Sequence, residues 1–157
     1  MANILATWTS FYANHAVVRT LVVFFHIGGL VIAGGSAIST DRAILRVSRR
    51  PIAERTGQLR ALHEIHLTVM FGLAVVIGSG LLLLGADTDT MLHSTLFWSK
   101  MALVVALLLN GFLLTRAGSQ AQSGISAGWR TLQITSVISV ALWMLITLAG
   151  AALPNVS

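Results

Sequence analysis

Residues 65–84 read IHLTVMFGLAVVIGSGLLLL, a run that contains no Asp, Glu, Lys or Arg. An apolar run of about 20 residues is long enough to cross the roughly 30 Å hydrocarbon core of a bilayer as a helix. Backbone polar groups find no water there, so a helix that satisfies them internally is the expected structure. This stretch therefore predicts a transmembrane helix.

Three further apolar runs of similar length flank this one. The chain of 157 residues is 55% hydrophobic and only 10% charged, which is more apolar surface than a soluble domain of this size can bury. We predict an all-α integral membrane protein, a single four-helix transmembrane bundle. Its spans are expected at about 17–38, 62–85, 96–115 and 131–153.

The first residues differ from these runs. The segment Ala2 to Asn14 mixes Trp8, Phe11 and Tyr12 with polar residues, which predicts a short amphipathic segment lying at the membrane interface. The apolar run after it is too long for a cleaved signal peptide, so we expect a retained helix.

Charge predicts the orientation. The net charge is +5, but the basic residues gather between apolar runs, which indicates lipid headgroup contact and topology rather than nucleic-acid binding. The positive-inside rule makes the first and third connections cytoplasmic and places both termini outside, in a bacterial inner membrane by default. The arginines of these connections are Arg42, Arg46, Arg49, Arg50, Arg55, Arg60, Arg116 and Arg130.

The chain contains no cysteine. This excludes disulfides, thiolate metal sites, iron–sulfur clusters and covalent haem attachment. Any metal must use His, Met, carboxylate, Lys or backbone oxygen.

His26 lies about halfway along the first span. A titratable side chain inside a membrane is costly, so it is a candidate functional residue. Gly29 and Ala33 follow at helical spacing, which predicts free volume beside the imidazole. We favour a ring nitrogen that binds a metal or a haem iron. The alternative is a neutral imidazole hydrogen-bonded to a neighbouring helix.

Lys100 lies about five residues inside the third span, roughly 7 Å below its outer end and at a depth similar to that of His26. Nearness to a helix end favours a side chain that extends to the headgroups. Facing inward, Lys100 would instead bind an anionic group such as a haem propionate, or donate a proton.

The second span begins with the HEIH sequence of residues 63–66. His63 and His66 share a helix face, and Met70 extends it by one turn. Two imidazoles and a thioether suit Cu(I) or another soft metal, and the spacing differs from that of an HExxH zinc protease. The alternative, strongest for His63, is a polar ring in contact with headgroups.

The third span, FWSKMALV at 97–104 followed by LLLNG at 107–111, resembles the third helix of the HemJ-type protoporphyrinogen oxidases and of the related copper-resistance D-type membrane domains. His26-Ile27 followed by Gly34-Gly35 resembles their first helix. The resemblance implies a haem-associated four-helix membrane protein in which His26 and Lys100 are the matched functional residues. The HEIH sequence and the loop compositions depart from the HemJ pattern, so the oxidase reaction itself carries over less readily.

The leading hypothesis is a haem-b-binding membrane protein that works in electron transfer or oxidation, with His26 as an axial ligand. The second ligand is His66 or Lys100, or else His26 and the pair His63/His66 serve two separate haems. One alternative is a copper- or metal-handling membrane protein that uses His63, His66 and Met70. Another is a cofactor-free accessory subunit of a larger membrane complex, or a homo-oligomer.

Overall fold

Six helices make up the part of the chain that the structure, a computed structural model, describes, namely residues 2–48, 52–123 and 126–156. Side chains are described for residues 4–48, 65–123 and 127–153. The helices are α1 (Ala2–Asn14), α2 (Ala16–Val47), α3 (Ile52–Ala86), α4 (Thr88–His93), α5 (Thr95–Gln122) and α6 (Ser126–Val156).

Four of these helices are long and apolar enough to cross a membrane: α2, the 65–86 part of α3, α5, and the 127–153 part of α6. Only 17–22% of each apolar window is buried inside the protein. Large apolar side chains such as Phe24, Leu67 and Leu148 therefore face outward, as expected where lipid replaces water. The predicted all-α, four-helix membrane bundle is confirmed.

The helices continue well past the apolar runs. α2 extends to Val47, and the N–H of Ser48 still binds the carbonyl of Ile44 at 2.9 Å. Hydropathy reports only the part of a helix that lies in hydrocarbon, whereas helical hydrogen bonding continues until a cap or a break. Residues 39–47, which read as the start of a loop, are thus helical and bring Thr40 and Asp41 into the bundle.

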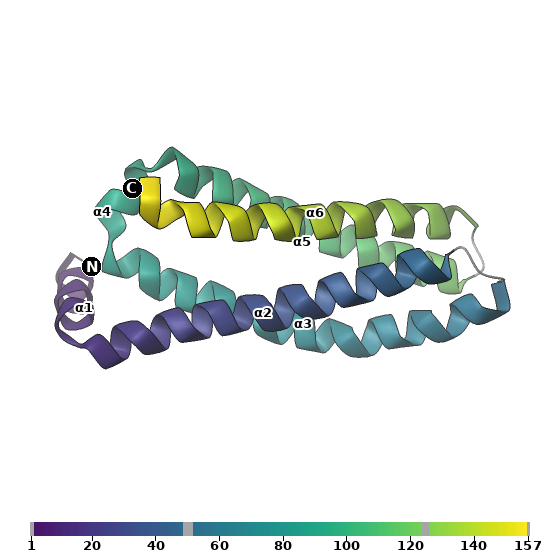
Figure 1. The fold of residues 1–157 in the computed structure, drawn as a ribbon, viewed down its shortest axis with the longest axis horizontal. Coiled ribbons are helices and arrows are strands. Elements are labelled where there is room, and N and C mark those ends of the chain that lie inside the picture. Colours follow the sequence, from purple (N-terminus) through teal and green to yellow (C-terminus); the bar gives the residue numbers. More distant parts are fainter. Residues whose placement is uncertain (1, 49–51, 124–125, 157) are drawn as a thin grey trace.

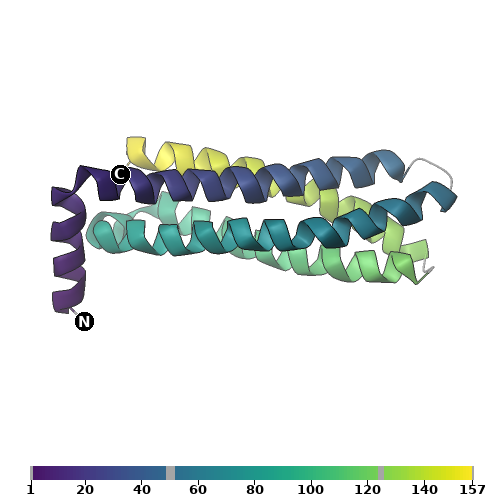
Figure 2. The same ribbon diagram turned by 90° about the horizontal axis from the view of Figure 1, so that it is seen from below.

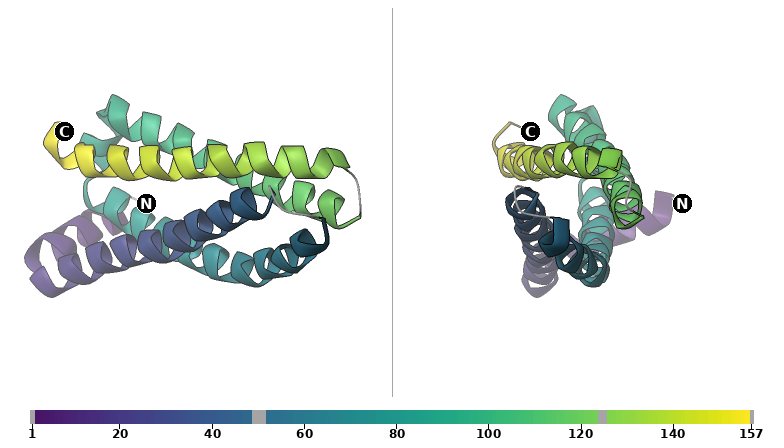
Figure 3. Two further views of the ribbon diagram at one scale, coloured as in Figure 1. Left: turned by 45° about the vertical axis from the view of Figure 1, so that its right-hand side comes forward. Right: turned by 90° about the vertical axis from the view of Figure 1, so that its right-hand side faces the viewer.

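The long helices form two antiparallel hairpins, α2–α3 and α5–α6, which pack on each other mainly through α2 and α6 (Figures 1 and 3). Trp143 of α6 lies against Gly34 of α2, where an added Cβ would come within 3.0 Å of the indole. By contrast, α3 and α5 touch at few points. The two hairpins therefore pack closely on the α2–α6 side of the bundle and leave the α3–α5 side open.

Glycine brings α2 and α3 together. A Cβ on Gly29 would lie 2.9 Å from the Gly72 carbonyl oxygen, and one on Gly72 would lie 2.8 Å from the backbone nitrogen of Ala33. The predicted free volume beside His26 at Gly29 and Ala33 is wrong, because the α3 backbone fills it. Small residues serve close helix packing here.

α1 crosses the end of the bundle (Figure 2). The indole Nε1 of Trp8 donates to the Leu82 carbonyl at 2.9 Å, and the hydroxyl of Thr9 donates to the Gly85 carbonyl at 3.2 Å. We call this end, which holds α1, α4 and the C-terminus, the terminal end. The opposite end, which holds Arg42, Arg46, Arg116 and Arg130, is the arginine end.

Candidate functional site

His26 is half-buried in the half of the bundle nearer the terminal end, where its Nδ1 lies 3.0 Å from the hydroxyl of Ser79 on α3. The single hydroxyl proton of Ser79 is donated to the carbonyl of Val75 at 2.6 Å. With that proton on Val75, the Ser79 oxygen can accept from Nδ1–H, which is the tautomer we infer for His26. A neutral His26 held in this way has its proton on Nδ1 and a free lone pair on Nε2. This tautomer binds a metal through Nε2.

Small residues and one cation surround this imidazole. A Cβ added to Gly80 of α3 would lie 3.4 Å from Cε1 of His26. Lys100 of α5 is close enough to interact electrostatically with His26. We call His26, Ser79, Gly80, Lys100 and Gly150 the histidine–lysine site.

Lys100 is directed sideways across the bundle. Its Nζ lies 3.4 Å from the position of a Cβ on Gly150 of α6. The sequence favoured a side chain extended toward the headgroups, and the glycine of α6 leaves room for the inward arrangement instead. In the described part of the chain no carboxylate pairs with Lys100.

His66 lies far from this site. On α3 it is thirteen residues from Ser79, the partner of His26, or about 20 Å along the helix. Two axial ligands must reach one iron from opposite faces. His26 and His66 therefore cannot share an iron, and this predicted ligand pair is wrong.

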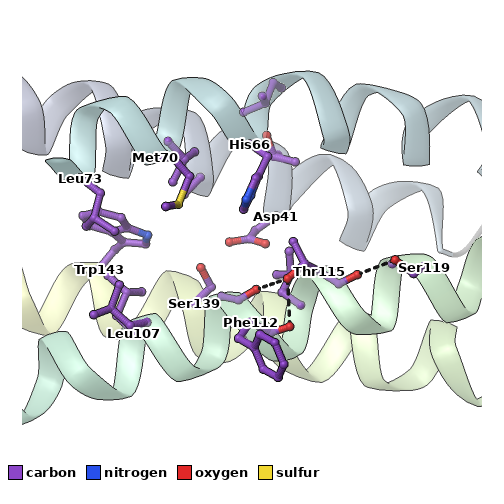
Figure 4. A pocket seen from close by; sticks show the side chains of 18 of the residues that line it. Asp41, His66, Met70, Leu73, Leu107, Phe112, Thr115, Ser119, Ser139 and Trp143 are labelled. Carbon is purple, nitrogen blue, oxygen red and sulfur yellow. Dashed lines mark hydrogen bonds between the residues drawn. The ribbon is translucent and has the colours of Figure 1, made fainter.

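The half of the bundle nearer the arginine end contains a second site, a pocket of about 610 Å³ between α2, α3, α5 and α6. Asp41, His66, Met70 and Trp143 line it, together with Ser139 (Figure 4). Its volume is in the range of small-molecule sites, about 300–1,000 Å³. We call it the aspartate pocket.

Asp41 lies at the floor of this pocket and is 2% exposed. Its carboxylate is next to the hydroxyls of Ser139 and Ser136, one turn apart on α6. Ser136 is completely buried, and its Oγ makes no hydrogen bond of ordinary geometry. Within the described ranges no Lys or Arg side chain pairs with Asp41, and the uncharged hydroxyls are its hydrogen-bonding neighbours.

His66 and Met70 line the α3 wall. The imidazole points toward Asp41, and the thioether sulfur points into the pocket (Figure 4). Because they are one turn apart on one face, His66 and Met70 cannot bind opposite faces of one haem. The side chain of His63 lies outside the described residues, and among the described ones no three His, Cys, Asp or Glu form a metal-binding group. The copper site stays a prediction.

Sequence reasoning missed Asp41, although a signal was present. The buried residues of α2 recur along one face, at Gly29, Ala33, Gly34, Thr40, Asp41 and Ile44. Extending that spacing past Ile38 places Asp41 seven residues after Gly34, on the same face. On α6, the pair Ser136 and Ser139 likewise lies between the buried Leu132 and Trp143.

Comparison with known proteins adds no relative: no family model, curated protein or solved structure matches the chain. The candidate sites therefore rest on the chemistry of their own residues.

Proposed function

We propose that this multi-pass membrane protein binds haem b at the histidine–lysine site and works in electron transfer or oxidation. His26 would hold the haem through Nε2, and Lys100 would be the neighbouring cation. Bound there, haem b would supply a one-electron redox centre. The chain's residues would hold and orient the haem and would set its reduction potential.

The contact between His26 Nδ1 and Ser79 is the observation that carries this proposal, because it favours the tautomer whose Nε2 is free. Ser79 uses its proton on Val75 and accepts from Nδ1 of His26, which leaves Nε2 as a free base. A hydrogen bond from the non-ligating nitrogen fixes the ring and raises the basicity of the ligand.

The ammonium group of Lys100 also supports haem as the ligand. An ammonium inside a membrane is costly unless it is paired or reaches water. The propionates of haem b are anionic groups that would pair with it. Gly80 and Gly150 keep the surroundings of both side chains free of bulk.

The distribution of arginines supports a proposal for the membrane and for the orientation of the bundle in it. We propose a bacterial inner membrane with the arginine end in the cytoplasm and both termini outside. An assembly with a larger membrane complex, or of several copies, stays open to test by co-purification.

An absorption spectrum of the detergent-purified protein, oxidised and then reduced with dithionite, tests the proposal. We expect a Soret band with sharp reduced α and β bands. His26→Ala should remove them. His66→Ala is the matched control, since it deletes an imidazole about 20 Å away, and it should keep them.

Two outcomes would overturn the proposal. One is a featureless visible spectrum after expression with ample haem. The other is haem that survives His26→Ala and is lost in His66→Ala, which would move the cofactor to the other half of the bundle.

A further inference from the structure

The aspartate pocket is a separate site with its own chemistry. Its floor is buried and its mouth is open to the side: Met70 is 48% exposed and Phe112 is 64% exposed, on α3 and α5 respectively. These are the two helices of the bundle that touch at few points. A membrane protein exposes such a mouth to lipid, so a ligand dissolved in the bilayer has a direct route to the floor.

Two serine hydroxyls of α6 face the Asp41 carboxylate at the floor of the pocket. Most described serines and threonines of the long helices donate to a carbonyl of their own helix, as Thr40, Ser79 and Thr135 do. Ser136 Oγ, which is completely buried, instead faces the Asp41 carboxylate without a hydrogen bond of ordinary geometry. It lies on the same face as Ser139, next to the Asp41 carboxylate.

Charge decides which ligand fits. A carboxylate inside a membrane is costly without a cationic partner. The Ser136 and Ser139 hydroxyls and the His66 imidazole face Asp41, and no described Lys or Arg side chain pairs with it (Figure 4). The walls are apolar and aromatic, with Trp143 and Phe112 among them. Aromatic faces stabilise organic cations, and methionine adapts to irregular apolar shapes.

We propose that the aspartate pocket binds a lipid-soluble organic cation, whose positive charge pairs with Asp41 and whose apolar groups contact Trp143 and Phe112. The ligand class is an amphipathic amine or a quaternary cation. The proposal does not rest on haem binding, because the histidine–lysine site is in the other half of the bundle.

Tetraphenylphosphonium is a suitable probe, since it is a hydrophobic cation without an exchangeable proton. Its binding to the full chain in nanodiscs is measured by equilibrium dialysis. We expect saturable binding that weakens about tenfold or more in Asp41→Asn, because the variant removes the buried charge. Asp87→Asn is the matched control: it makes the same charge change at an exposed residue of the terminal end and should bind as the unmodified protein does.

A second measurement needs no variant, in case Asp41→Asn fails to fold. Tetraphenylborate has the same shape as the phosphonium and the opposite charge, so the unmodified protein should bind it without saturation. Equal saturable binding of the two ions would overturn the proposal, as would full phosphonium affinity in Asp41→Asn. An equal loss of phosphonium affinity in Asp41→Asn and Asp87→Asn would show that net charge alone attracts the probe. That result would also overturn the proposal.

Discussion

At the scale of single residues, two ionisable groups in the bundle, Lys100 and Asp41, have no Asp, Glu, Lys or Arg partner in the described part of the chain. Lys100 lies beside His26 toward the terminal end, and Asp41 lies beside two serine hydroxyls toward the arginine end. Each is costly to hold inside a membrane. This opposite placement of a cation and an anion is the basis for assigning two ligands of opposite charge.

Ser79→Ala tests the orientation of His26. The variant removes the acceptor for Nδ1–H, so ring orientation and ligand basicity are lost. Loss of such a supporting hydrogen bond typically weakens metal binding about 10–100-fold, and we expect haem per protein to fall. The haemochrome assay measures this ratio. Ser99→Ala is the control, because Ser99 is exposed and bonds only to its own helix; equal loss in both variants would count against the orienting role.

Lys100→Met tests the role of the nearby cation. A positive charge favours the reduced, less positive haem, so its removal should lower the midpoint potential, while Lys100→Arg should keep the potential near its original value. A redox titration followed in the α band measures it. An unchanged potential in Lys100→Met would place the ammonium away from the haem.

At the scale of helices, glycine sets how closely α2 and α3 pack, and two neighbouring positions give a matched pair. Gly29→Ala places a methyl group against the α3 backbone, whereas Gly28 has nothing within 4 Å of an added Cβ.

We expect Gly29→Ala to destabilise the protein by about 1–3 kcal/mol, as overpacking does. Gly28→Ala should be neutral or stabilising, because alanine is the better helix former by about 1 kcal/mol. Thermal unfolding midpoints in detergent compare the two variants. A Gly29→Ala protein as stable as Gly28→Ala would show that the helices separate without cost.

The sequence predicted the helices better than their ends. Hydropathy identified the four spans because lipid-facing residues must be apolar whatever they pack against. It stopped at Ile38 in α2, since the following residues are polar, and so it assigned Asp41 to a loop. Which groups meet depends on helix phase and crossing: Gly29 and Ala33 were expected to leave space, and their contact with Gly72 appears only once α3 is in place.

At the scale of the whole molecule, an even number of spans puts α1 and the C-terminus at the same end (Figure 1). Because the chain has no cysteine, single cysteines can report topology without background. We expect Ser94→Cys to react with an impermeant maleimide from outside the cell. Ser123→Cys should react only after the membrane is opened. The reverse pattern would invert the proposed orientation.

The central claim is that the bundle holds two independent sites, and measuring haem content and tetraphenylphosphonium binding on the same preparations tests it most directly. The account predicts that His26→Ala loses haem and keeps phosphonium binding, while Asp41→Asn keeps haem and loses phosphonium binding. If either variant loses both ligands while its unfolding midpoint is unchanged, the two sites are one and the account is wrong.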